Sequence, residues 1–283
     1  MYQFSFRSLR AAIVSAGAIF SLLALPAPHL ASPSAMAAGI SAADVDATYK
    51  ITLNGFELGS FHFGSNVEQD HYTLDTDIEI SAFLGVIHWK GATRSTGAIA
   101  AKSPKPADFL FEYESSAKAG SVKIGFGEKG VESLSVEPVA LALPDEIPLT
   151  EAHLKGVLDP LTAIMALTHV DAPTPCGRKV AIFDGKQRFD LDLQFARAER
   201  LAGTSETALV CRVKYQPIAG YTPTDETRAL AASNEIEIAF RPVPAAKLML
   251  PQSVSLPTPA GHARLDLVQI RVKAARGQVA SVN

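Results

Sequence analysis

The sequence is poor in the residues that would indicate nucleic-acid binding or a dense disulfide framework. Its 283 residues include two cysteines and one tryptophan, and its 26 basic residues are outnumbered by 29 acidic ones. A net charge of −3 gives no sign of the basic footprint that phosphate-backbone binding requires, so we expect no nucleic-acid partner. With 47% hydrophobic and 19% charged residues, the composition excludes a collagen-like, coiled-coil or predominantly disordered chain.

Catalytic and metal-binding motifs are missing as well. There is no G-x-S-x-G nucleophile elbow, no H-x-x-x-H pair and no C-x-x-C pair. Residues 125–130 match G-x-G-x-x-G, but a strand-like stretch follows where dinucleotide binding needs a helix, so we predict a hairpin turn. We therefore expect a non-enzymatic protein with no cofactor and no metal site. An enzyme would require several of His62, His71 and His88 to converge with acidic pairs in one cleft.

Acidic residues two positions apart recur along the chain. On a strand, such residues share one face about 7 Å apart, a separation that a two-carboxylate hydrolase could use. Because the pattern repeats instead of converging, we interpret the pairs as solvent-exposed faces of amphipathic strands. These pairs include Asp44/Asp46, Asp75/Asp77, Glu112/Glu114, Asp190/Asp192 and Glu235/Glu237.

A long apolar run occurs only near the N-terminus. Arg7 and Arg10 precede an uncharged apolar stretch at residues 11–25, and Ala35-Met36-Ala37 fits the small-residue pattern of a signal-peptidase site. Fifteen apolar residues are fewer than the about 20 that span a bilayer, and two prolines directly after the run argue against an uncleaved anchor. We predict that residues 1–37 are a cleaved secretory signal. Residues 38–283 are then one exported β-rich domain that does not span a membrane after cleavage.

Both cysteines, Cys176 and Cys211, fall in the expected mature region. An even number of cysteines in an exported protein favours a disulfide, and closing this loop would stabilise the fold by about 4 kcal/mol in the chain-entropy description. A catalytic thiol and a metal pair remain as alternatives, although neither cysteine has a histidine nearby in sequence.

Short alternating segments separated by turn residues dominate the mature region and predict an antiparallel all-β protein. Asn54-Gly55 and Asp184-Gly185 are strong hairpin signals, and Gly59-Ser60 indicates a bulge. Asp159-Pro160 predicts the start of a helix that extends to His169, and residues 222–233 suit a second short helix. We predict about a dozen strands, at residues 49–53, 56–63, 71–80, 87–99, 108–116, 120–127, 131–137, 178–183, 187–195, 207–216, 234–241, 247–256 and 263–273.

Large aromatic side chains fall on the apolar faces of several predicted strands, while few elements are available to cover them. A curved sheet of this kind either closes around a packed core or leaves an apolar concavity. If the sheet stays open, we expect its apolar concavity to bind a lipid-sized ligand. The candidates for lining such a site are Phe61, Phe63, Phe109, Phe111, Phe183, Phe189 and Phe195.

The residues at the predicted turns, around the cysteines and at the predicted helix start together resemble the sequence pattern of a known family. The stretch Phe183-Asp184-Gly185-Lys186-Gln187-Arg188-Phe189-Asp190-Leu191 and the pattern Cys211-x-Val-x-Tyr215-x-Pro217-x-x-Gly220-Tyr221 are similar to the periplasmic domain-of-unknown-function family 3108 of Gram-negative bacteria. The N-terminal Tyr49…Gly55…Leu58-Gly59 hairpin and the Asp159-Pro160-Leu161 helix start also suit that family.

This resemblance implies a curved, spiral-like or half-open barrel sheet, similar in general form to the Lol lipoprotein carriers and to envelope-integrity proteins. It carries over no catalytic residues. We expect a periplasmic cell-envelope protein that binds a lipid, a lipoprotein or an envelope protein on a concave sheet face. The alternative is an interaction module with a filled barrel core that supports envelope integrity. Fold analogy alone is an associational argument for lipid binding.

Overall fold

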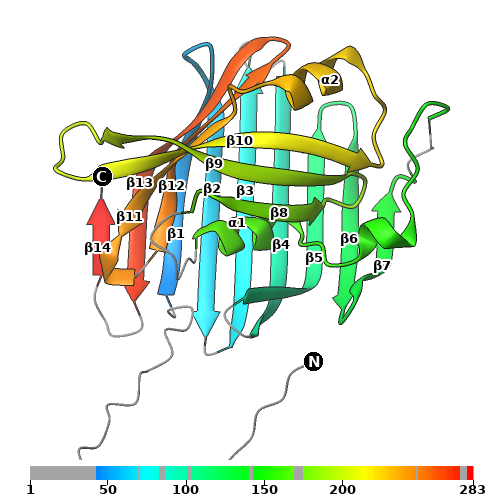
Figure 1. Cartoon of the computed structure of the whole chain (residues 1–283), viewed down its shortest axis with the longest axis horizontal. Helices are drawn as coiled ribbons and strands as arrows, with labels where there is room; N and C mark the ends of the chain where they lie inside the picture. Colours follow the sequence, from blue (N-terminus) through cyan, green and yellow to red (C-terminus); the bar gives the residue numbers. More distant parts are fainter. Residues whose placement is uncertain are drawn as a thin grey trace, which may run out of the picture. The chain divides into compact units, whose positions relative to one another are not determined.

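A single antiparallel sheet organises the protein (Figure 1). The computed structural model describes residues 43–68, 70–82, 87–100, 103–139, 143–168, 175–246, 248–274 and 279–282. Within these residues, thirteen strands follow the order β7-β6-β5-β4-β3-β2-β1-β13-β12-β11-β10-β9-β8, and β14 pairs with β13 outside this order. The predicted all-β fold with a curved, open antiparallel sheet is confirmed. The predicted signal segment, residues 1–37, and His169 lie outside the described residues.

The first seven strands form what we call the first wing, a series of hairpins in chain order. They are β1 Ala43–Leu53, β2 Phe56–Glu68, β3 His71–Ala82, β4 Ile87–Ala100, β5 Ser103–Ser115, β6 Ala119–Gly127 and β7 Gly130–Glu137. Residues 125–130 end β6 and begin β7, so the glycine motif is the predicted hairpin turn. Strand β3 shows why this region folds as a sheet: Tyr72, Leu74 and Thr76 are buried, while Asp75 and Asp77 on the opposite face are exposed.

Local turn chemistry determines the first hairpin. Asn54 and Gly55 have φ angles of 49° and 85°, the two positive values that a type I′ turn requires. The register between β1 and β2 shifts where Ile51 faces Gly59 and Thr52 faces Glu57, which confirms the predicted bulge. The hairpin and its bulge are thus encoded by a few adjacent residues.

The remaining strands of the ordered sheet form the second wing. They are β8 Arg178–Phe183, β9 Arg188–Arg200, β10 Thr207–Ala219, β11 Glu237–Val243, β12 Leu248–Thr258 and β13 Gly261–Ala274, while β14 is Val279–Val282. The Asp184 carboxylate accepts hydrogen bonds from the backbone N–H groups of Lys186 and Gln187 at 2.8 and 2.6 Å, and Gly185 has a φ of 98°. These contacts close the predicted β8–β9 hairpin. The two wings meet where β1 pairs with β13.

Two α-helices occur in the described residues: α1 Pro160–Thr168 and α2 Asp225–Ala232. Both confirm predicted helices, and the 3₁₀ turns η1 Glu151–Leu154 and η2 Pro244–Ala246 are additional. No described helix is long and apolar enough to cross a membrane.

Helix α1 lies between the wings. It contacts β3, β4 and β5 of the first wing and β8 and β12 of the second. In Figure 1, β8, β9 and β10 run across the strands of the first wing, with α1 close to this crossing. Seven of the nine residues of α1 are buried. A nine-residue helix is marginal by itself, so its stability derives from this enclosure.

The sheet approaches closure without achieving it. Lys155 forms an isolated bridge to Gly130 at the start of β7, and Leu158 forms one to Ile182 in β8. The β8–β9 turn also packs on the first wing, because a Cβ added to Gly185 would lie 2.1 Å from a Val122 methyl group. Strands β7 and β8 remain the two ends of the ordered sheet.

Candidate functional site

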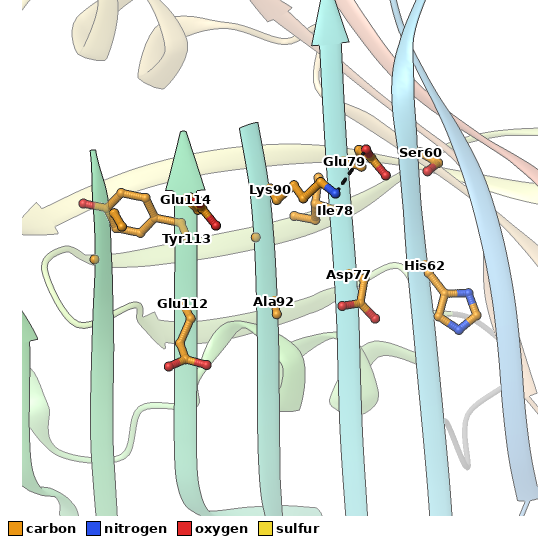
Figure 2. A pocket seen from close by; sticks show the side chains of 13 residues that line it. Ser60, His62, Asp77, Ile78, Glu79, Lys90, Ala92, Glu112, Tyr113 and Glu114 are labelled. Carbon is orange, nitrogen blue, oxygen red and sulfur yellow. Dashed lines mark ion pairs between the residues drawn. The ribbon is translucent and has the colours of Figure 1, made fainter. Parts of the chain in front are cut away.

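A broad, open depression lies on the charged face of the first wing. This groove has a volume of about 580 Å³ and is lined by side chains from β2 to β6, as Figure 2 shows. Ala92 of β4 lies directly between Asp77 of β3 and Glu112 of β5 in the strand register. Because its side chain is small, a space remains between the carboxylates of β3 and those of β5. The labelled polar lining residues are Ser60, His62, Asp77, Glu79, Lys90, Glu112, Tyr113 and Glu114.

The charges of this groove remain in solvent. Lys90 approaches Glu79 at 3.5 Å, and both side chains are 56% exposed. Exposed ion pairs of this kind contribute little stability and do not create a desolvated reaction centre. Across the described residues, no three histidine, cysteine, aspartate or glutamate side chains are grouped so that they could hold a metal ion. The Asp75/Asp77 and Glu112/Glu114 pairs are exposed, as predicted.

The pair Asp190/Asp192 departs from that prediction, because Asp190 is buried at 7% exposure. Its carboxylate lies 2.7 Å from the Lys179 ammonium and 2.5 Å from the Arg188 guanidinium. Burial alone would raise the pKa of Asp190, but these two cations outweigh burial and hold the pKa below its usual range. The interpretation of every acidic pair as a solvent-exposed face was wrong at this position, since Lys179 of the neighbouring β8 and Arg188 of β9 itself supply the countercharges.

A polar network holds α1 to the first wing. Asp159 caps the helix, and its Oδ1 accepts hydrogen bonds from the backbone N–H groups of Leu161 and Thr162 at 3.0 Å each. Its Oδ2 accepts hydrogen bonds from the hydroxyls of Thr162 at 2.6 Å and of Ser95, in β4, at 3.0 Å. The Tyr72 hydroxyl, from β3, lies 2.9 Å from the Thr162 hydroxyl. These four polar side chains thus satisfy one another inside the protein.

Asp159 is completely buried in this network. Desolvation raises its pKa, and the hydrogen bonds from Thr162, Ser95 and the Leu161 backbone oppose that effect without cancelling it. Within the described part of the chain, no cation pairs with this carboxylate. Its bonds go to the helix backbone and to neighbouring hydroxyls, so we interpret Asp159 as a helix cap that fixes α1 in the interior.

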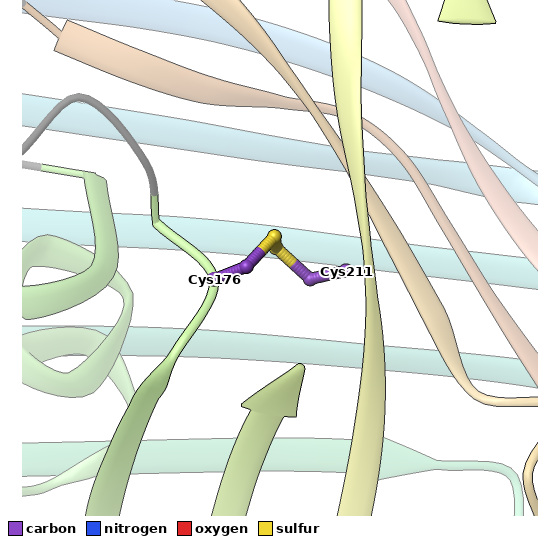
Figure 3. Close-up of a disulfide and its surroundings, with 2 residues drawn as sticks. All are labelled: Cys176 and Cys211. Carbon is purple, nitrogen blue, oxygen red and sulfur yellow. A yellow bond between two sulfur atoms is a disulfide. The ribbon is translucent and has the colours of Figure 1, made fainter. Parts of the chain in front are cut away.

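An apolar cluster and a disulfide hold α1 to the second wing. Cys176 and Cys211 are joined, which confirms the favoured interpretation of the cysteines (Figure 3). The bond connects the segment before β8 to the middle of β10. The other buried members of this cluster are Ala163, Leu167, Val180, Ile182, Leu193, Val213 and Phe240.

A small apolar pocket remains between α1 and the sheet. Its volume is about 150 Å³, and its walls come from α1, β1, β2, β11, β12 and β13. Its polar atoms are already engaged: the Tyr49 hydroxyl donates to the Pro251 carbonyl at 2.9 Å, and the Thr168 hydroxyl donates to the Met165 carbonyl at 3.2 Å. The pocket therefore offers a guest almost nothing except apolar contact. Its lining residues are Tyr49, Phe61, Phe63, Ile164, Leu167, Thr168, Ile238, Phe240, Leu250, Pro251, Val254 and Leu265.

Six of the seven predicted aromatic residues separate into three groups. Phe61 and Phe63 line the apolar pocket. Phe109 and Phe183 are fully packed in the core, at 5% and 0% exposure, so they present no open surface. Phe111 and Phe189 are half-buried and contact other rings, with centroids 5.7 Å from Tyr113 and 5.5 Å from Tyr215, respectively.

Phe195 requires a correction. Its side chain is 60% exposed, so the prediction that it faces inward was wrong. Phe195 pairs with Cys211 in regular register with the pairing of Leu193 and Val213, and the register with β10 shifts only after it, before Arg197. The burial of Leu193 therefore does not extend to the next residue on the same strand face.

The pocket also contains residues that the sequence did not single out. Ile164 and Leu167 lie in the predicted helix, while Phe240, Leu250, Val254 and Leu265 lie in predicted strands. Their alternation indicated burial. The alternation gave no sign that α1 would cover the sheet at the apolar pocket, because the contact between α1 and these strands joins distant parts of the sequence.

The architecture defines an all-β protein whose open antiparallel sheet wraps around one buried helix. The chain belongs to the family described as "Protein of unknown function (DUF3108)", whose profile matches residues 48–268. The match begins in β1 and ends in β13, so it includes both wings. No curated protein and no solved structure gives a significant match.

Proposed function

We propose that this protein is a non-enzymatic component of the periplasmic cell envelope that binds a lipid or a lipoprotein by the end of an acyl chain. The apolar pocket between α1 and the sheet is the observation that carries this proposal. Two of the aromatic residues picked out by sequence, Phe61 and Phe63, line it, and its hydroxyl groups are engaged by backbone carbonyls. Apolar contact is the main interaction left for a ligand.

The size of the pocket limits the guest. A volume of about 150 Å³ lies below the 300–1,000 Å³ typical of drug-sized sites. A dry apolar cavity of about this size accommodates a molecule such as benzene. The pocket thus suits the terminal methylenes of one chain, with the remainder of the ligand outside the pocket.

The larger groove on the first wing is a weaker candidate for this role. It is lined by exposed carboxylates, which an acyl chain would have to desolvate without compensation. The features of a secretory signal at residues 1–37 and the use of both cysteines in one disulfide support export to an oxidising compartment.

The test is ligand-observed NMR on the mature chain, residues 38–283, with sodium dodecanoate as the probe. We expect saturation to be strongest at the terminal methyl group of the chain. Leu265→Trp would fill the pocket and abolish the signal, whereas Phe195→Ala removes an exposed ring away from the pocket and should retain it. Equal saturation in the wild type and in a folded Leu265→Trp protein, or none in the wild type, would overturn the proposal. Val254→Phe serves the same purpose if Leu265→Trp does not fold.

Native mass spectrometry of protein purified from periplasm provides a second readout. We expect a co-purifying acyl-chain ligand on the wild type and on Phe195→Ala, with none on the pocket-filling variant. This measurement does not depend on the choice of dodecanoate.

A second candidate function is an interaction module with a filled interior. It is favoured by the burial of α1, which occupies the space that a larger ligand would need. In that case the partner would bind the outside of the sheet, and filling the pocket would leave the function unchanged.

A further inference from the structure

The two ends of the ordered sheet differ in how their outer edges are covered. Along β8, the Leu158 N–H donates to the Ala181 carbonyl, and the Leu158 carbonyl accepts from the Phe183 N–H, both at 2.9 Å. Along β7, coverage stops at the bridge between Gly130 and Lys155. For residues 131–137, within the described part of the chain, no backbone hydrogen bond to anything other than β6 occurs.

The uncovered edge of β7 also lacks the lysine and proline that often protect an edge against strand pairing. Proteins commonly place lysine, proline or an inward-pointing charge on such edges. Residues 131–137 contain no lysine and no proline. The Glu132 carboxylate folds back over β6, since a Cβ added to Gly127 would overlap one of its oxygens. The strand therefore presents an accessible row of backbone donors and acceptors.

An apolar side chain marks the centre of this edge. Leu134 is 44% exposed and lies opposite Ile124, a core residue with 2% exposure. Leu134 thus shares the apolar face of the sheet, but it lies at the margin of the covered region. A further strand added beside β7 would extend that face.

We propose that β7 pairs antiparallel with β7 of a second copy of this chain, about a two-fold axis through Leu134. The sequence of residues 131–137, VESLSVE, favours this register. Leu134 would face its own copy, Ser133 would face Ser135, and each glutamate would face a valine. No two like charges are opposed, and opposed serines can hydrogen-bond across the strands.

The pairing suits a second copy better than an arbitrary strand because the pattern is close to symmetric about Leu134. A two-fold interface requires such self-complementarity. Seven residues on each side are fewer than the 20–30 that a standard interface contains, so the dimer is weak and dependent on concentration.

Cysteine cross-linking tests the register directly, because both native cysteines are held in one disulfide. Leu134→Cys places two thiols at the axis, and we expect a covalent dimer to form under mild oxidation at least tenfold faster than with the control Val268→Cys. Val268 is 46% exposed, similar to Leu134, but lies on β13. Equal rates for the two variants would overturn the register.

Sedimentation velocity tests the dimer itself. We expect the wild type to shift towards a dimer as its concentration rises to several hundred micromolar. Leu134→Lys would place two ammonium groups face to face and eliminate that shift, while Val268→Lys would not. A wild type that remains monomeric over this range, or a dimer unaffected by Leu134→Lys, would overturn the proposal. Dimer formation and dodecanoate binding are measured separately, so the dimer proposal can be overturned while the proposed function stands, and the reverse.

Discussion

Helix α1 is attached to the two wings by different kinds of interaction. Its start is bound to the first wing by hydrogen bonds among Asp159, Thr162, Ser95 and Tyr72. Its other side packs on the second wing through an apolar cluster that contains the Cys176–Cys211 disulfide. The attachment to the first wing depends on the geometry of its hydrogen bonds and on the protonation state of Asp159. The attachment to the second wing depends on apolar burial and a covalent bond. The two wings should therefore respond to different perturbations.

The largest expected effect comes from removing the disulfide. Cys176→Ala together with Cys211→Ala should lower the free energy of unfolding by about 4 kcal/mol, because the unfolded chain regains the freedom of a long loop. Urea unfolding under oxidising conditions measures this loss. With reductant present, the variant and the wild type should unfold at nearly the same urea concentration. Equal losses with and without reductant would show that the bond does not stabilise the second wing.

A smaller effect is expected when the polar attachment is cut. Asp159→Ala removes the helix cap and leaves buried hydroxyl and N–H groups without an acceptor, at a cost of about 3 kcal/mol. The matched control is Thr224→Ala, which removes the cap of α2, a helix without buried residues. That change should cost about 1 kcal/mol or less. Thermal unfolding compares the two, and similar losses would mean that the network around Asp159 adds nothing beyond an ordinary cap.

The smallest effect is a change in the pH dependence of stability. Because burial raises the pKa of Asp159, the folded protein binds this proton more strongly than the unfolded chain. The resulting stabilisation is fully present below the unfolded pKa of about 3.9 and is lost as pH rises through the folded pKa. Asp159→Asn should eliminate this contribution, so the difference in stability between wild type and variant should depend on pH in this window. A constant difference would contradict the shift.

Asp190 provides the opposite case and a control for that experiment. Its pKa is held low by Lys179 and Arg188 despite its burial, so its contribution is lost as pH falls. Both carboxylates contribute to the pH dependence of stability of the wild type. The difference in stability between the wild type and Asp159→Asn isolates the contribution of Asp159, because Asp190 is present in both proteins.

The features that the sequence predicted are those encoded by adjacent residues. Asn54-Gly55 specifies the first turn, alternation specifies the strands, and Asp159-Pro160 specifies the start of α1. Each depends on local conformational preference or on a short repeat. The membership of a β-rich family was recognisable for the same reason.

The features that escaped prediction depend on distant contacts. Thr162 meets Tyr72 and Ser95, which lie 90 and 67 positions away, so nothing in the helix sequence revealed the network. The burial of Asp190 depends on cations positioned by β8 and β9. The sequence of β9 does not distinguish the exposed Phe195 from the buried Leu193 two positions earlier. The apolar pocket could be foreseen only in part, through Phe61 and Phe63, because its other wall is α1.

The pairing of β1 with β13 has a consequence for how the chain folds. Each wing is assembled largely from neighbouring hairpins, but this seam joins residues more than 200 positions apart, such as Ala43 and Ala274. Long-range pairing of this kind slows folding because a large loop must close before the contacts form. During synthesis, β1 therefore has no partner on one side until nearly the whole chain has emerged. The middle of the sheet is the last part that can be completed, and a chain truncated before β13 would leave that open edge free to aggregate.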